Sequence, residues 1–208
     1  MKILALELSS GQGSVAWLEN DREPFVRIFA NDRKHSGLFF ENLQLCSREF
    51  GAPDAIVVGL GPGSYAGVRI AIATAVGLRA ASATKLVGIA SICGMDTAAR
   101  EYCVIGDARR ASFFFGRVSD GRLMEGPSLH SGVELEMKVM EYSVPLYASE
   151  PLPQFPKAML AYPSARRLAE VTCDQVGEIA DTPSLEPIYL REPHITLSKA
   201  SRVSAIYQ

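Results

Sequence analysis

A short glycine loop is the stretch of this sequence in which residue types and spacing come closest to a chemical site. The run GLGPGSYAG begins at Gly59 and follows the compact apolar segment DAIVV. Gly61 and Gly63 would let the backbone turn sharply and expose its amide groups beside the positive end of the next helix, an arrangement that binds anions. The loop therefore indicates either a phosphate pocket or a tight turn between a strand and a helix.

The phosphate interpretation is the weaker one because the residues that usually complete such a pocket are missing. A P-loop needs a Lys followed by Ser or Thr, and the chain has neither in that position. The spacing of Gly61, Gly63 and Gly67 differs from the dinucleotide-binding pattern GxGxxG, and Ser64 does not stand in a GxSxG elbow. We expect Ser64 to cap the helix that follows.

That helix, expected over about residues 67–83, is rich in small side chains. Two rows of small residues have a four-residue spacing: Gly67, Ala71 and Ala75, and Ala73, Gly77 and Ala81. Small residues at this spacing allow another helix to approach closely. The neighbour could be the chain's own helix near residues 36–50, a partner protein, or both on different faces.

Metal and thiol chemistry are not favoured by the remaining reactive side chains. The four cysteines are far apart and form no CxxC pair: Cys46, Cys93, Cys103 and Cys173. The three histidines are scattered and form neither HxxxH nor HExxH: His35, His130 and His194. We therefore expect buried thiols of a reducing compartment and no metal site.

The elements that must position these residues follow from hydrophobic periodicity. Strands are expected at 2–8, 14–19, 24–30 and 54–61, with a helix at 35–51 before the last of them. A weaker copy of this order follows, with strands at 102–108, 111–119, 122–130 and 144–149, and a helix at 131–142. The sequence thus predicts an α/β protein of two lobes, residues 1–100 and an abbreviated, proline-rich 101–208, each with a mixed sheet flanked by helices.

Composition bounds the class of partner. The chain has 208 residues, 48% of them hydrophobic, and a formal net charge of −2. A protein that grips nucleic acid alone usually carries a basic face, so we expect any contact with RNA to need another component. The apolar run at the N-terminus is too short for a signal peptide, which favours a cytoplasmic protein.

Several motifs fall in an order that resembles the TsaB (YeaZ) family. They are ILALELSS, GSVAW, His35 opening a helix, GLGPGSYAGVRIAIATAVGL, IASI, IGDARRASFFFG and EPIYLR. The resemblance spans residues 1 to about 118 and resumes at Pro187–Arg191. It implies the actin and heat-shock ATPase-like fold, in which each of two lobes is built on a ribonuclease-H-like unit.

The resemblance also implies a function. Family members take part in synthesis of threonylcarbamoyladenosine on tRNA as non-catalytic partners of the related subunit TsaD, which they meet through a helix bundle. We accordingly expect no catalytic residue and no cofactor in this chain. We also expect a TsaE-like ATPase to bind near the junction with the TsaD-like subunit and tRNA to contact only the complex. The chain alone is expected to form a homodimer. The residues expected at the partner interface are His35, Leu38, Phe39, Gly67, Arg69, Ala71, Ile72 and Ala75.

A vestigial nucleotide site is the second implication. Its expected residues are Glu7, Ser9, Ser10, Gly11, Gly61, Gly63 and Ser64. Glu7 stands where the family commonly has Asp, GPGSYAG replaces the usual GPGSFTG, and the second lobe offers no glycine-rich loop, so half of a phosphate clasp is missing. The alternative is an autonomous ATPase or kinase of the same fold, with Glu7 and Asp107 as candidate carboxylates; a metallopeptidase is less favoured.

Overall fold

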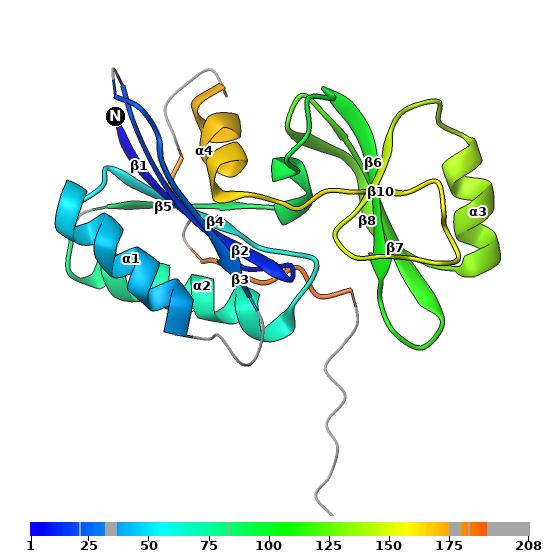
Figure 1. Cartoon of the computed structure of the whole chain (residues 1–208), viewed down its shortest axis with the longest axis horizontal. Helices are drawn as coiled ribbons and strands as arrows, with labels where there is room; N and C mark the ends of the chain where they lie inside the picture. Colours follow the sequence, from blue (N-terminus) through cyan, green and yellow to red (C-terminus); the bar gives the residue numbers. More distant parts are fainter. Residues whose placement is uncertain (21, 32–36, 83, 175–179, 183, 191–208) are drawn as a thin grey trace, which may run out of the picture.

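Two five-stranded sheets, placed side by side, make up the protein (Figure 1). The computed structural model describes residues 1–190 except 21, 32–36, 83, 175–179 and 183. His35 of the predicted interface and the end of the PIYLR motif lie outside the described residues. No helix within the described ranges is long and apolar enough to cross a membrane.

The first sheet has the strand order β3-β2-β1-β4-β5. Its strands are β1 (Lys2–Glu7), β2 (Gln12–Glu19), β3 (Phe25–Ala30), β4 (Ala55–Gly59) and β5 (Lys85–Ile89). Short hairpins make β1, β2 and β3 antiparallel, whereas helical crossovers make β4 parallel to β1 and β5 parallel to β4. The central strands are buried on both faces, which explains their nearly continuous apolar sequence.

The second sheet repeats this topology in the order β8-β7-β6-β9-β10. Its strands are β6 (Glu101–Asp107), β7 (Ser112–Ser119), β8 (Arg122–Ser131), β9 (Leu146–Ala148) and β10 (Met159–Leu160). β6, β7 and β8 are antiparallel neighbours, and β9 joins β6 in parallel. The predicted repeat of element order, and with it the predicted fold class, is confirmed.

Helices cover both faces of the first sheet. α1 (Gly37–Phe50) and α2 (Tyr65–Ala80) lie on one face, and α4 (Ala165–Asp174) lies on the other (Figure 1). The alternation of side chains along a strand produces this division: Leu4 and Leu6 pack toward α1 and α2, whereas Ile3 and Ala5 pack toward α4. Residues from the second half of the chain thus complete the core of the first lobe.

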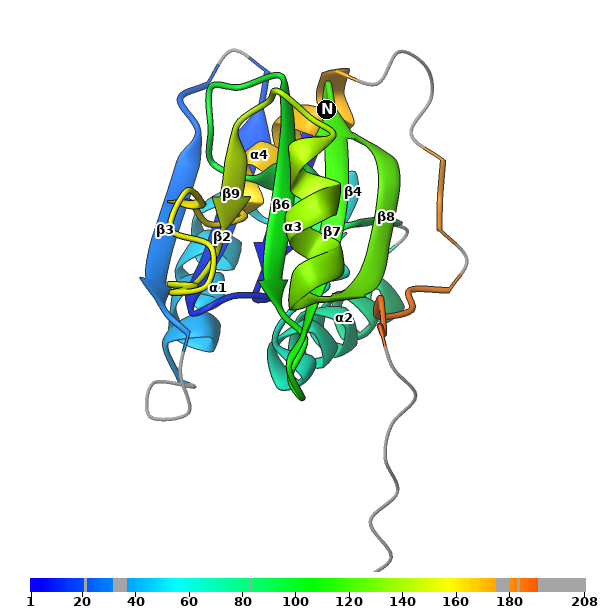
Figure 2. The same cartoon turned by 90° about the vertical axis from the view of Figure 1, so that its right-hand side faces the viewer.

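The second sheet has a single α-helix of its own within the described ranges, α3 (Gly132–Met140), which packs on β7 and β8 (Figure 2). Leu135 of α3 is fully buried among phenylalanines of β7. The opposite face of this sheet packs on the short 3₁₀ helix η1 (Ser91–Gly94), which follows β5 and leads toward the second lobe. The boundary between the sheets falls between η1 and β6, close to the predicted boundary at residue 100. The predicted second lobe of residues 101–208 is wrong in one respect, because α4 packs on the first sheet and Leu185 lies in the core of the first lobe.

Differences from the sequence prediction concern short elements. β5 and β10 were not predicted, because five- and two-residue strands carry little periodic signal. α2 begins at Tyr65 rather than Gly67 because Ser64 caps it and starts the helix earlier. It ends at Ala80, three residues before the predicted end at Ala83, which lies outside the described residues.

Candidate functional site

The glycine loop packs backbone to backbone on the hairpin between β1 and β2. The Ser64 amide donates a hydrogen bond of 2.6 Å to the carbonyl oxygen of Ser9. A Cβ atom on Gly63 would lie 2.1 Å from that same oxygen, so this position excludes any side chain. Gly61 has a φ of 87°, in the region that favours glycine. The loop therefore rests against the hairpin rather than standing open above it.

The start of α2 is held against the same hairpin. The Ser64 hydroxyl accepts a hydrogen bond of 3.2 Å from the Gly67 amide, which confirms the predicted helix cap. A Cβ atom on Gly67 would lie 2.0 Å from the carbonyl oxygen of Leu8. Gly67 was expected to meet a partner, but it is buried against the chain's own first hairpin.

The hairpin directs its polar groups inward. Glu7 Oε1 accepts a hydrogen bond of 2.5 Å from the Ser9 amide, and the Ser10 hydroxyl donates to the Gln12 carbonyl at 2.9 Å. The Asn31 side-chain amide donates to the carbonyl of Ser10 at 2.8 Å, while its backbone amide donates to the carbonyl of Gly11 at 2.9 Å. These bonds tie the turn of the hairpin to β2 and to Asn31.

Glu7 lies at the centre of this arrangement and is completely buried. Burial raises the pKa of its carboxyl group above the ordinary value, against the smaller opposing effect of hydrogen bonds from Ser9. Its second oxygen, Oε2, has no hydrogen-bond partner in the described part of the chain. Glu7 Oε2 lies 1.8 Å from the position that a Cβ atom on Gly59 would take. A carboxyl group so enclosed can hold the hairpin but does not meet solvent.

The structure therefore brings the predicted nucleotide-site residues together: Glu7, Ser9, Ser10 and Gly61 are buried, whereas Gly11, Gly63 and Ser64 are exposed. Ser91, which sequence reasoning missed, joins this arrangement: its hydroxyl accepts a hydrogen bond of 2.9 Å from the Gly61 amide. Ser91 is fully buried and its amide donates to the Gly61 carbonyl at 2.8 Å. It lies in the quoted motif IASI, but no feature of that motif indicated a contact with the glycine loop.

Asp107, the other candidate carboxylate, occupies the equivalent place in the second lobe, at the end of β6. It accepts hydrogen bonds from the amide of Arg109 at 2.6 Å and from the Arg109 guanidinium at 3.2 Å. Its own amide donates to Glu150 at 3.2 Å. Asp107 thus orders the turn between β6 and β7 through its contacts with Arg109.

The predicted interface residues of α1 and α2 divide by burial. Ala71 and Ala75 are 0% exposed and pack in the core of the first lobe, together with Phe39 of α1. Leu38 and Ile72 are half-buried against the same core. Only Arg69 among the described members of the set is well exposed. The row Gly67, Ala71 and Ala75 faces the chain's own sheet, so it cannot meet a partner in this fold.

The opposite face of α2 is exposed and almost uncharged. Its exposed residues are Tyr65, Ala66, Arg69, Ile70, Ala73, Val76, Gly77 and Ala80. We call this set the α2 outer face. Ile70 and Val76 are 38% and 49% exposed, and Arg69 is the only charged member. An amphipathic surface helix normally presents polar side chains on this side.

Two aromatic rings lie at the N-terminal end of this face. Tyr65 of α2 contacts Tyr189, from the end of the described chain, with ring centroids 5.5 Å apart. The Arg69 guanidinium lies 5.1 Å from the Tyr65 ring centroid and donates a hydrogen bond of 2.5 Å to its hydroxyl. Sequence reasoning missed both tyrosines, although Tyr189 stands within the quoted motif EPIYLR.

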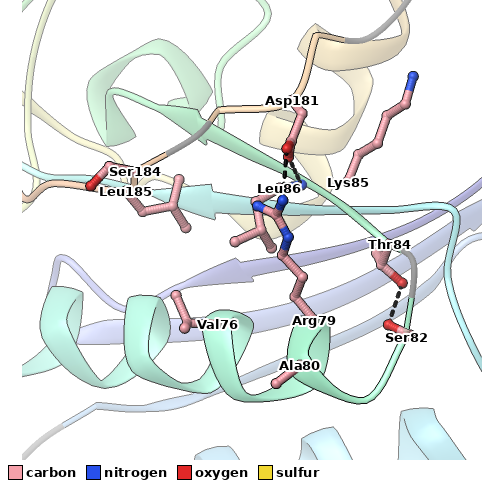
Figure 3. Close-up of a pocket in the computed structure, with 10 residues that line it drawn as sticks. All are labelled: Val76, Arg79, Ala80, Ser82, Thr84, Lys85, Leu86, Asp181, Ser184 and Leu185. Atoms are coloured by element: carbon pink, nitrogen blue, oxygen red, sulfur yellow. Dashed lines mark hydrogen bonds and ion pairs between the residues drawn. The ribbon is translucent and has the colours of Figure 1, made fainter.

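A surface groove of about 900 Å³ opens at the other end of α2, between this helix, β5 and the segment near residue 181 (Figure 3). Asp181 bridges its walls: one carboxylate oxygen contacts the Arg79 guanidinium at 2.9 Å, and the other accepts from the Leu86 amide at 2.8 Å. The groove was not predicted because its walls come from distant parts of the chain. The described residues contain no cluster of three or more His, Cys, Asp or Glu that could hold a metal.

Comparison with known proteins gives this geometry its context. Residues 35–126, which include α1, the glycine loop and α2, match the family model described as TsaD, tRNA N6-adenosine threonylcarbamoyltransferase. The fold is that of YeaZ from Pseudomonas aeruginosa: two solved structures superpose with TM-scores of 0.74 and 0.71 at 24% identity, over 91% of this chain and 99% of theirs. The predicted resemblance to the TsaB (YeaZ) family is thus confirmed in the fold.

Mycobacterial proteins are similar in sequence. The uncharacterized protein Rv3421c of Mycobacterium tuberculosis is 30% identical over 145 residues, which cover 67% of this chain and 65% of that protein. An uncharacterized protein of Mycobacterium leprae is 34% identical over 85 residues, which cover 40% of this chain and 23% of that protein. The match therefore spans less than two thirds of either relative.

Proposed function

We propose that this chain belongs to the TsaB (YeaZ) family and is a partner subunit of a TsaD-type threonylcarbamoyltransferase that modifies tRNA. Two comparisons support this assignment from different directions. The fold agrees with YeaZ along nearly the whole of that chain, and the region around α1 and α2 matches the TsaD family model. The proposal assigns the chemistry to the TsaD-type subunit and gives this chain a structural role.

The observation that carries the partner role is the α2 outer face. Burying exposed Ile70 and Val76 against another protein would be favourable in proportion to the apolar area removed from water. The small residues Ala73, Gly77 and Ala80 would let a second helix approach closely. Since the buried side of α2 already contacts the chain's own sheet, the outer face remains for a partner.

The buried Glu7 carboxyl group beside the glycine loop supports a non-catalytic role. The Ser64 amide is bonded to Ser9, the Gly61 amide is bonded to Ser91, and Glu7 is enclosed. An autonomous ATPase of this fold would need this carboxylate to reach its metal or water, and Glu7 is 0% exposed. No observation favours that alternative over the partner role.

Further members of the assembly are part of the same proposal. A TsaE-like ATPase would bind near the junction of the two subunits, tRNA would bind only to the complex, and the chain alone would form a homodimer through the α2 outer face. A two-fold contact of this kind uses the same surface on both copies. Homodimer and complex would therefore compete for that surface.

Analytical ultracentrifugation tests the proposal. The chain is sedimented alone and mixed with the TsaD-type protein of the same organism, and a one-to-one complex is expected in the mixture. Val76→Glu, which places a charge in the middle of the α2 outer face, should abolish the complex without unfolding the chain. Met137→Glu on α3, where the side chain is 60% exposed in the other lobe, is the matched control and should leave the complex intact. Absence of a complex with the unchanged chain, with or without ATP, would refute the partner role.

A further inference from the structure

Asp181 and Thr182 are hydrogen-bonded to the edge strand β5 of the first sheet, and Figure 3 shows Asp181 at this edge. The Thr182 amide donates to the Leu86 carbonyl at 2.7 Å, and the Thr182 hydroxyl accepts from the Gly88 amide at 3.2 Å. Asp181 adds the contacts to Arg79 and to the Leu86 amide described above. The two residues thus occupy donors and acceptors of β5 that a sheet edge would otherwise expose.

The segment Asp181–Leu190 is anchored at two further points. Leu185 is 9% exposed and belongs to the core of the first lobe, where Gly88 leaves room for it. The Ile188 amide donates a hydrogen bond of 2.8 Å to the carbonyl of Leu60, directly before the glycine loop. Leu190 packs against the hydrophobic cluster of η1 and the second sheet. Tyr189 therefore lies between two neighbours that contact the rest of the chain.

Tyr189 is nevertheless half-exposed. Its side chain is 45% exposed and that of Tyr65 is 53% exposed, although the two rings contact each other. Arg69 extends beside them, and no carboxylate in the described part of the chain forms an ion pair with it. Tyrosine and arginine, with tryptophan, are enriched among the residues that dominate binding energy at protein interfaces.

We infer that Tyr65, Arg69 and Tyr189 form an anchor at the N-terminal end of the α2 outer face. In this inference the segment Asp181–Leu190 holds Tyr189 at the interface for the partner subunit. The inference rests on the proposed function and adds to it the three residues that contact the partner and the kind of partner side chain that they would bind. The chemistry that matches this anchor is an apolar side chain against the two tyrosine rings and a carboxylate against Arg69.

Two features favour a protein over RNA as the occupant. The anchor continues directly into the uncharged outer face through Ile70 and Ala73, which offer apolar contacts and no charge for a phosphate backbone. Arg69 is also the only charged residue of that face, whereas surfaces that bind RNA gather several basic side chains. A planar guanidinium held against a ring is well suited to a carboxylate.

Binding of the full-length chain to the TsaD-type protein, measured by calorimetry, tests the inference. Tyr189→Ala should weaken binding by about 30-fold, as expected for a central aromatic residue of an interface. Tyr189→Phe should bind like the unchanged chain, because it keeps the ring that contacts Tyr65. Met140→Ala, at an 81% exposed position of α3, is the surface control and should have no effect. Arg69→Glu should weaken binding by about tenfold or more, and added salt should strengthen the binding of this variant because it screens the repulsion between two carboxylates.

The outcomes separate this inference from the proposed function. If the unchanged chain does not bind the TsaD-type protein, the proposed function and the inference both fail. If the unchanged chain binds and both Tyr189→Ala and Arg69→Glu bind equally well, the inference alone is overturned. If these variants keep their affinity for the protein but the complex loses affinity for an anticodon stem–loop RNA, the anchor serves RNA and the inference is again overturned. Thermal unfolding of each variant shows that the fold is retained.

Discussion

Gly59 and Glu7 should be energetically coupled, because a side chain at one position and the carboxylate at the other cannot occupy the same space. A Cβ atom at residue 59 would lie 1.8 Å from Glu7 Oε2 and 2.6 Å from the Ser91 hydroxyl oxygen. Glu7 is 0% exposed, so it cannot escape into solvent. Gly59→Ala therefore forces the carboxylate to move by roughly 1 Å or more against close-packed neighbours.

The magnitude follows from the contacts that are lost. Overpacking at a buried site costs about 1 to 3 kcal/mol, and displacement of Glu7 also weakens its hydrogen bond from the Ser9 amide, worth about 1 kcal/mol. We expect Gly59→Ala to lower the free energy of unfolding by about 3 kcal/mol. Glu7→Asp removes one methylene and should cost about 1 kcal/mol, since a shorter carboxylate can still accept from the amide two residues later.

The double variant distinguishes coupling from independent effects. Asp at position 7 withdraws the oxygen from the space above residue 59, so the two substitutions together should cost about 1 to 2 kcal/mol less than their sum. Part of the cost remains, because the Ser91 hydroxyl still lies close to the new methyl group.

Urea unfolding followed by fluorescence of Trp17 measures all four proteins. Trp17 is the single tryptophan and is 2% exposed in the first lobe, so it reports on the lobe that contains both substitutions. Gly77→Ala is the matched control: no atom lies within 4 Å of the new Cβ, and alanine is the better helix former, so this variant should gain up to about 1 kcal/mol. Additive costs of Glu7→Asp and Gly59→Ala would refute the steric argument.

Three further results are expected. Burial raises the pKa of the Glu7 carboxyl group, so the native state favours its protonated form. This stabilisation is complete below the ordinary pKa near 4.5 and is lost as the pH rises through the pKa of the native state. The stability of Glu7→Gln relative to the unchanged chain should therefore increase with pH above about 4.5, and a pH-independent difference in urea midpoints would contradict this. A thiol reagent added to the folded protein should modify Cys173 alone, because Cys173 is exposed and the other three cysteines are buried. Burial also raises the pKa of the Cys46 and Cys93 thiols to about 12, and a count of modified thiols checks the expectation. The Ser131 hydroxyl caps α3 by accepting a hydrogen bond from the Glu134 amide. Ser131→Ala removes this cap and should lower the free energy of unfolding in urea by about 1 kcal/mol, whereas Ser131→Asp should change it little.

Local features of this protein could be predicted from the sequence because their causes are local. The strands of both lobes follow from short apolar runs between turn residues, and their repeated order predicts two related sheets. Ser64 was predicted as a helix cap because a hydroxyl directly before a helix can bond only the first-turn amides. The apolar character of α2 on all sides is likewise visible in the sequence, and it already indicated contacts on more than one face.

Tertiary structure decided which face of α2 is free, since a helix with small apolar residues all round has no periodic signal to orient it. Gly67 packs on the hairpin at Leu8, and the core of the first lobe buries Ala71 and Ala75, which leaves the outer face exposed. The return of α4 to the first sheet and the contact of Tyr189 with Tyr65 depend on chain segments far apart in sequence. Such contacts arise from packing of completed elements, so no local pattern of residues specifies them.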